Sequence, residues 1–149
     1  MSENITTTLA QRHVIIIGID TGTNTGIAVS NKPERKFLQI LSLPIHRAME
    51  LVLKYHQQHG AALFVRFEDA RLRKWLKDKS PESLQGAGSI KRDCTIWDDF
   101  LKDHGVHYAS IGPRAGLTKI PADKFSLITG WEGKTNNHAR DAAMLVYGY

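Results

Sequence analysis

Four residues whose side chains bind hard divalent cations are spread along the sequence, at Asp20, Glu68, His138 and Asp141. Asp20 and Glu68 each follow a run of apolar residues. His138 and Asp141 are three residues apart, so they share a face if their segment is helical. Three carboxylates and one imidazole in a single pocket suit Mg²⁺ or Mn²⁺. Without a cation the carboxylates would repel one another, and at least one would tend to stay protonated.

The elements that must position these side chains alternate between apolar strands and amphipathic helices. A strand ending at Asp20, a crossover helix and a strand ending at Glu68 form a right-handed unit with the two strands parallel. Neighbouring strands lie about 4.8 Å apart, so both carboxylates should leave the same end of a sheet within reach of one ion. We expect strands at 14–20, 26–29, 37–43, 61–67 and 106–111, and helices at 45–59, 90–104, 122–128 and 138–147. The order of elements predicts one mixed sheet with helices packed on it.

Each candidate also has an ordinary interpretation. Asp20 precedes Thr21-Gly22-Thr23-Asn24, where an aspartate can simply stabilise the turn. Asp141, near the start of a helix, can complement the helix dipole, and Asn136 or Asn137 can cap that helix. In the helix at 90–104 we expect Ile96, Trp97, Phe100 and Leu101 to point inward.

Composition narrows the class of protein. The chain has 149 residues, a net charge of +5 and a pI of about 9.4, which suits a polyanionic partner. A single cysteine, Cys94, excludes an internal disulfide and a cysteine-based zinc site. We expect a flexible tail at 1–12, a single domain at 13–149, no membrane-spanning segment and a cytoplasmic protein.

The ordered motifs resemble the RuvC family of Holliday junction resolvases, within the ribonuclease H-like superfamily. They are Gly18-Ile19-Asp20-Thr21-Gly22 with Gly26-Ile27-Ala28-Val29, then Phe67-Glu68, then His138-Ala139-Arg140-Asp141-Ala142-Ala143. The resemblance implies an α/β fold, with a five-stranded mixed sheet of order 3-2-1-4-5, strand 2 antiparallel, flanked by helices. It also implies a homodimer with two active sites.

The same resemblance implies a reaction and assigns residues to it. Asp20, Glu68 and Asp141 match the family's acidic positions, and His138 stands where many members carry aspartate. The implied cofactor is Mg²⁺, or Mn²⁺, with two ions per active site. Asp20 would contact both ions, Glu68 would complete one site, and His138 and Asp141 the other. Family members cut phosphodiester bonds and leave 5′-phosphate and 3′-hydroxyl ends. On this basis we choose Glu68 over Asp69, which we expect to be a solvated or arginine-paired surface acid.

Basic residues near these motifs are candidates for DNA contact. The candidates are Arg71, Arg73, Lys74 and Trp75 after the second acidic strand, and Lys119 and Lys124 before the last helix. Trp75 would stack on an unpaired base. Alternatively, the first group forms a solvated helix face with its tryptophan in the core, and the two lysines are merely exposed. Trp97 and Phe100 fit either the core or a dimer interface.

Two other functions fit part of the sequence. The Asp20-Thr21-Gly22-Thr23 turn also resembles the first phosphate loop of actin-like and sugar-kinase ATPases. Those proteins need two such lobes, and no Gly-x-x-x-x-Gly-Lys sequence is present. The other alternative is a branched-DNA-binding protein that no longer cuts. The expected substrate is branched DNA, with four-way junctions, forks and flaps left open.

Overall fold

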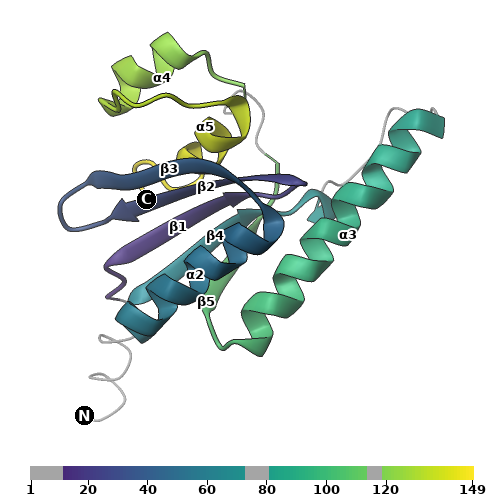
Figure 1. Ribbon diagram of the computed structural model, residues 1–149, viewed down its shortest axis with the longest axis horizontal. Helices are drawn as coiled ribbons and strands as arrows, with labels where there is room; N and C mark the ends of the chain where they lie inside the picture. Colours follow the sequence, from purple (N-terminus) through teal and green to yellow (C-terminus); the bar gives the residue numbers. More distant parts are fainter. Residues whose placement is uncertain (1–11, 73–80, 114–118) are drawn as a thin grey trace.

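The computed structural model describes residues 12–72, 81–113 and 119–149, with the backbone alone for 81–87. Its five strands form one sheet in the order β3-β2-β1-β4-β5 (Figure 1). The strands are β1 (Ile15–Asp20), β2 (Asn24–Asn31), β3 (Lys36–Pro44), β4 (Leu63–Glu68) and β5 (His107–Ile111). The helices are α2 (Ile45–His59), α3 (Pro81–Asp103), α4 (Ala122–Thr129) and α5 (Asn137–Met144), with short 3-10 turns η1 (Gly60–Ala62) and η2 (Ala70–Leu72).

The pairing of the strands is mixed. β2 runs antiparallel to both β1 and β3, while β1, β4 and β5 are parallel. The parallel step from β1 to β4 requires a crossover, and β2, β3 and α2 make up the intervening chain. The expected strand order and the antiparallel second strand are therefore confirmed.

Helices cover both faces of the sheet, α2 and α3 on one and α4 and α5 on the other (Figure 1). Side chains alternate between these faces along β1, as the pleat requires. Ile17 and Ile19 pack with Val52 of α2 and Trp97 of α3, whereas Ile16 packs with Val146 just beyond α5. Because Asp20 is two residues beyond Gly18, it points to the α5 face.

Two glycines let α5 lie directly against strand backbone. A Cβ atom built on Gly18 would stand 2.1 Å from the carbonyl oxygen of Ala142, and one on Gly26 would stand 1.9 Å from that of His138. Any side chain at either position would push the helix away. Gly18 and Gly26 therefore set how closely the helix that carries His138 and Asp141 approaches β1 and β2.

Details of the helices differ from the sequence prediction in places. Helix α3 begins at Pro81, ahead of the helix start expected at residue 90, and regular helix α5 ends at Met144, short of residue 147. Ile96 was expected to point inward but is 42% exposed. The buried stripe of α3 follows Cys94, Trp97 and Leu101, and Ile96 lies about 200° around the helix from Cys94. Trp97, fully buried, belongs to the core.

The remaining expectations concern membrane spanning, the N-terminal tail, the domain and the location of the protein. In the part of the chain that the structure describes, no helix is long and apolar enough to cross a membrane. The tail expected at 1–12 lies almost wholly outside the described residues. The single domain at 13–149 and the cytoplasmic location stay predictions.

Candidate active site

The carboxyl ends of β1 and β4 bring the first two acidic residues together. Asp20 is the register partner of Glu68 across the parallel pair, so the two side chains leave neighbouring strands on the same face of the sheet. Asp20 is in turn paired with Gly26 on β2. Four apolar residues precede Gly18 in β1 and its approach, and this run is typical of a strand buried on both faces that ends in a functional side chain.

Helix α5 places the side chain of His138 beside Asp20. His138 Nδ1 lies 3.1 Å from Asp20 Oδ2, which joins residues 118 positions apart in the sequence. The helix start is fixed by Asn136, whose Oδ1 accepts a hydrogen bond of 2.9 Å from the Ala139 backbone N–H. Of the two caps expected from the sequence, Asn136 is the one the structure uses.

Asp141 stands one turn further along α5 and faces the segment before α4. Its Oδ1 accepts a hydrogen bond of 2.8 Å from the backbone N–H of Lys119. Lys119 has φ of 56°, a left-handed conformation that is uncommon for a residue with a side chain. This backbone turn therefore directs an N–H group at a carboxylate of the candidate site.

The electrostatics single out Asp20. Burial raises the pKa of this carboxyl, the nearby charge of Asp141 raises it further, and the hydrogen bond from His138 opposes both. The net effect raises the pKa of Asp20 to about 6. A buried carboxylate with another acid beside it gains from a cation, which removes the repulsion.

A cysteine from the opposite face supports both strand ends. Cys94 of α3 is fully buried, shares a hydrogen bond of 3.5 Å with Thr21 Oγ1, and donates its S–H to the Glu68 carbonyl at 3.8 Å. These contacts tie the residue after Asp20 and the backbone of Glu68 to the same helix. Burial raises the pKa of the Cys94 thiol, so it is a packing group with little thiolate character.

The donor set suits Mg²⁺ or Mn²⁺ in chemical type, with carboxylates and one imidazole. As the side chains stand, however, no group of three or more His, Cys, Asp or Glu residues among those described is close enough together to hold an ion. Asp20 is hydrogen-bonded to His138, and Asp141 is hydrogen-bonded to backbone. The structure thus pairs Asp20 with Glu68 in strand register and with His138 through a hydrogen bond, and the convergence of all four on one ion stays a prediction.

Sequence reasoning missed Arg140, which holds the surroundings of α5 in place. This buried guanidinium donates hydrogen bonds to the backbone carbonyls of Ile120 and Thr135, to Thr135 Oγ1 and to Asn137 Oδ1, at 2.7 to 2.8 Å. It thereby fixes both the segment that carries Lys119 and the loop that leads into α5. An arginine between Ala139 and Asp141 in a helix was the only signal in the sequence, and spacing alone assigns it no partner.

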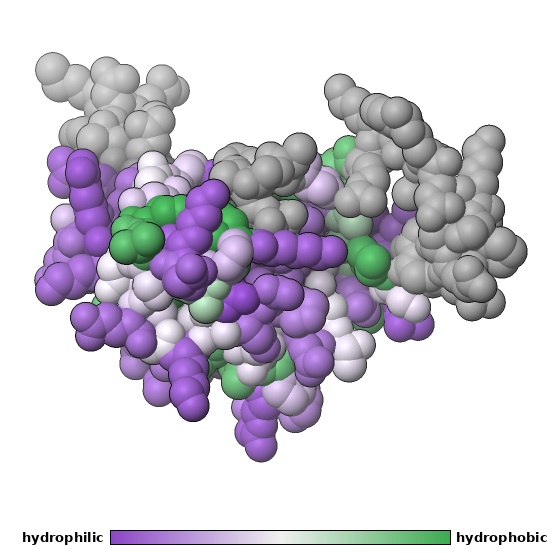
Figure 2. Space-filling view, turned by 90° about the horizontal axis from the view of Figure 1, so that it is seen from above, coloured by the Kyte–Doolittle hydropathy of each residue, from purple (hydrophilic) through white to green (hydrophobic). Residues whose placement is uncertain are grey.

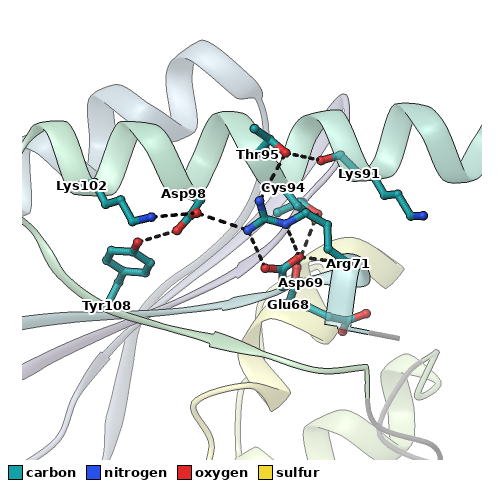
Figure 3. A network of polar contacts seen from close by, with 10 residues as sticks. Glu68, Asp69, Arg71, Lys91, Cys94, Thr95, Asp98, Lys102 and Tyr108 are labelled. Atoms are coloured by element: carbon teal, nitrogen blue, oxygen red, sulfur yellow. Dashed lines mark hydrogen bonds and ion pairs between the residues drawn. The ribbon is translucent and has the colours of Figure 1, made fainter. Parts of the chain in front are cut away.

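Asp69 and Arg71 belong to a separate polar network, built around the buried carboxylate of Asp69 (Figure 3). Arg71 contacts Asp69 through Nε and a terminal nitrogen at 2.9 and 2.8 Å, and contacts Asp98 of α3 at 3.4 Å. Asp69 was expected to be solvated or paired with arginine at the surface. The pairing is confirmed, but the surface location is wrong, because Asp69 is only 1% exposed.

The structure describes three of the residues predicted to contact DNA, and these three lie in different surroundings. Arg71 pairs with Asp69 and Asp98, and its contact with DNA stays a prediction. The side chains of Lys119 and Lys124 are exposed on the same side of the sheet as α5. Arg73, Lys74 and Trp75 lie outside the described residues.

No protein-family model matches the chain, and no curated protein matches it in sequence. Its structure is similar to that of T. thermophilus RuvC in complex with Holliday junction substrate, with a TM-score of 0.55 and 17% sequence identity. The similarity covers 89% of this chain and 90% of that chain. Together with the strand order, this likeness defines a ribonuclease H-like fold, which confirms the fold expected from the sequence.

Proposed function

We propose that this protein is a metal-dependent, structure-selective DNA endonuclease that cuts Holliday junctions or related branched DNA. The observation that carries the proposal is the hydrogen bond between Asp20 and His138, with Asp20 paired in register to Glu68, at the carboxyl end of β1 in a ribonuclease H-like sheet. Further support comes from the fold shared with RuvC, which was solved with such a substrate, and from the net charge of +5.

The residues proposed to hold two Mg²⁺ or Mn²⁺ ions are Asp20, Glu68, His138 and Asp141. The raised pKa of Asp20, caused first by burial and then by the charge of Asp141, supports this assignment, because a bound cation would offset both effects. When bound, the ions would supply activation of water and stabilisation of the departing 3′ oxygen, leaving 5′-phosphate and 3′-hydroxyl ends.

The chain's own groups would orient this chemistry. The hydrogen bond from His138 favours the ionised form of Asp20, which is the form that binds cations. The Lys119 backbone N–H holds one oxygen of Asp141 and leaves the other for the site. The exposed amines of Lys119 and Lys124 would pair with phosphates of the DNA strand.

Incubation of the protein with end-labelled four-way DNA in Mg²⁺ or Mn²⁺ tests the proposal. We expect nicks that DNA ligase reseals and that disappear with EDTA. Asp20→Asn should abolish cutting while leaving a shifted DNA band in EDTA. The matched control is Asp103→Asn, an exposed acid at the end of α3, which should cut like the wild type.

Three results would contradict the proposal. Binding without any cutting would favour a branched-DNA-binding protein. ATP hydrolysis without cutting would favour the actin-like alternative. Loss of DNA binding together with cutting in Asp20→Asn would argue against a metal role for Asp20.

The proposal includes a homodimer with two active sites. Such a dimer predicts paired, symmetric nicks on opposite arms of the junction. Light scattering of the protein alone should give twice the 16.7 kDa chain mass. A monomeric mass with single, unpaired nicks would contradict this part of the proposal.

A further inference from the structure

A pocket of about 280 Å³ lies beside the first turn of α5, between that turn and β3. Its polar lining comes from Ser42 on β3 and from Lys134, Thr135 and Asn136 in the loop before α5. Ile40 and Ala139 contribute to its apolar floor. The pocket is separate from the acidic residues of the candidate active site, which do not line it.

The lining favours an anion. Lys134 brings a positive charge, the residues named as lining include no carboxylate, and the start of α5 carries the positive end of its helix dipole. Two polar side chains already have their acceptor atoms occupied. Thr135 Oγ1 accepts from Arg140, and Asn136 Oδ1 accepts from Ala139, which leaves the hydroxyl and amide hydrogens as donors for a ligand.

The position of the pocket follows from strand register. Ser42 is paired with Gly26, and Gly26 is paired with Asp20, so the three residues form one line across the sheet. Two strand spacings separate the pocket wall from Asp20, which is about 10 Å. The His138 carbonyl rests on Gly26 between them. A DNA strand that passes Asp20 and crosses the first turn of α5 would therefore reach the pocket.

The surface on this side of the molecule is mainly hydrophilic. Figure 2 shows the face seen from above Figure 1, on the side of α4, as largely hydrophilic with separate hydrophobic areas. A broad apolar area, which would indicate a protein partner, is not the dominant feature of the coloured surface.

We propose that this pocket is a phosphate subsite that holds the DNA backbone next to the bond that is cut. The inference rests on the proposed nuclease function and adds a contact for a flanking phosphodiester. Lys134 supplies the charge, and Ser42, Thr135 and Asn136 supply hydrogen-bond donors. Such a contact fixes the register of the strand over Asp20 without reading its bases.

Single methylphosphonate linkages, which remove one phosphate charge at a time, test the subsite in a four-way junction. In EDTA, Lys134→Ala should weaken binding of the unmodified junction about tenfold. At one linkage near the nick, the methylphosphonate should weaken wild-type binding by a similar factor and leave Lys134→Ala nearly unaffected. The control is Lys54→Ala, an exposed lysine of α2 on the opposite face, which should respond to every linkage as the wild type does.

If the losses of binding affinity caused by Lys134→Ala and by the methylphosphonate multiply at every linkage, the subsite is overturned. Binding that depends on base identity and not on phosphate charge would also overturn it. A separate measurement keeps the subsite distinguishable from the nuclease. Titration of the metal-free protein with a short single-stranded thymidine oligonucleotide should shift the NMR amide signals of Ser42 and residues 134–136. Such shifts in a protein that cuts no junction would support the subsite while contradicting the nuclease. Unchanged signals in a protein that cuts would overturn the subsite alone.

Discussion

Two acidic regions lie at the carboxyl ends of β1 and β4, on opposite faces of the sheet. The first, here the acidic edge, comprises Asp20, Glu68, His138 and Asp141. The second, here the Asp69 network, comprises Asp69, Arg71, Asp98, Lys102 and Tyr108 (Figure 3). The neighbours Glu68 and Asp69 divide between the two, because successive side chains leave a strand in opposite directions.

The pKa of the buried aspartate is shifted in opposite directions in the two regions. Burial alone would raise the pKa of Asp69, but hydrogen bonds and charge from Arg71 outweigh it and hold that pKa below its ordinary value. The pKa of Asp20 is raised to about 6 by burial and by Asp141. The Asp69 network supplies its own cation, whereas the acidic edge is short of positive charge. This difference supports the assignment made above, with a structural role for the Asp69 network and the proposed cation binding at the acidic edge.

The largest predicted effect comes from a glycine substitution that disrupts the acidic edge and leaves its acidic residues unchanged. Gly26→Ala places a Cβ atom against the His138 carbonyl, which is backbone and cannot rotate away. We expect α5 to shift and the free energy of unfolding to fall by more than about 3 kcal/mol, with loss of cutting. Urea denaturation measures the change.

The matched control for Gly26→Ala is Gly88→Ala in helix α3, where an added Cβ meets no atom within 4 Å beyond the neighbouring backbone of its own helix. This substitution should stabilise the protein by up to about 1 kcal/mol, since alanine favours helix. Equal effects of the two substitutions would show that close contact with α5 does not matter.

The next prediction breaks the Asp69 network. Arg71→Ala removes the cation beside a carboxylate that is only 2% exposed, so we expect a loss of about 3 kcal/mol in the free energy of unfolding. Arg47→Ala, which removes the exposed pair with Glu50, should cost less than about 1 kcal/mol and serves as control. A small loss for Arg71→Ala, combined with weaker DNA binding, would instead favour the DNA-contact role.

The third prediction is a substitution that stabilises the protein, whereas the first two destabilise it. In metal-free protein, Asp20→Asn should raise the free energy of unfolding by about 2 kcal/mol at pH 7, because a carboxylate with a raised pKa destabilises the fold when ionised. The native carboxyl stays protonated up to about pH 6, whereas the unfolded one ionises near pH 4. Wild-type stability therefore falls as pH rises between these values, and the gain in Asp20→Asn should vanish below pH 4.

Thermal denaturation at several pH values in EDTA measures this gain. Asp103→Asn should stay within about 0.5 kcal/mol of the wild type throughout. A destabilised Asp20→Asn at pH 7 would mean that the Asp20 charge is satisfied by the fold, and the contrast between the two regions would disappear.

The smallest predicted effect is a pH-dependent loss of stability when the hydroxyl of Tyr108 is removed from the Asp69 network. The hydroxyl of Tyr108 donates to Asp98 and is the main cause of the lowered pKa of that carboxyl. Tyr108→Phe should cost about 1 kcal/mol at pH 7. The native carboxylate is favoured above pH 4 and this contribution fades as pH falls below it, so the cost should shrink in acid.

The control for the tyrosine is Tyr147→Phe, which removes a hydroxyl bound to the uncharged Ile128 carbonyl. Its effect on stability should not change between pH 7 and pH 3. The same pH profile for both substitutions would mean that the charge of Asp98 plays no part.

Local sequence predicted the strands and the placement of Asp20 and Glu68 because buried strands are visible as apolar runs, and parallel pairing follows from the crossover. The direct contact of His138 with Asp20 depends on how closely α5 lies on the sheet. That distance is set by Gly18 and Gly26, whose contacts with α5 are made only in the folded chain.

Two other features escaped prediction for related reasons. Asp69 is buried because Arg71 folds back onto it from η2, which neither residue's type requires. Arg140 is buried because two loops offer it carbonyl oxygens, and carbonyls are present at every position of any sequence. Partners supplied by backbone cannot be inferred from residue identity.

The contact of α5 with bare strand backbone has a consequence for tolerance to mutation. Because α5 meets β1 and β2 through backbone at Gly18 and Gly26, the separation between His138 and the strand that carries Asp20 depends little on the size of apolar side chains packed elsewhere. Hydrophobic residues elsewhere could therefore be exchanged over many generations while the geometry of the acids stays the same.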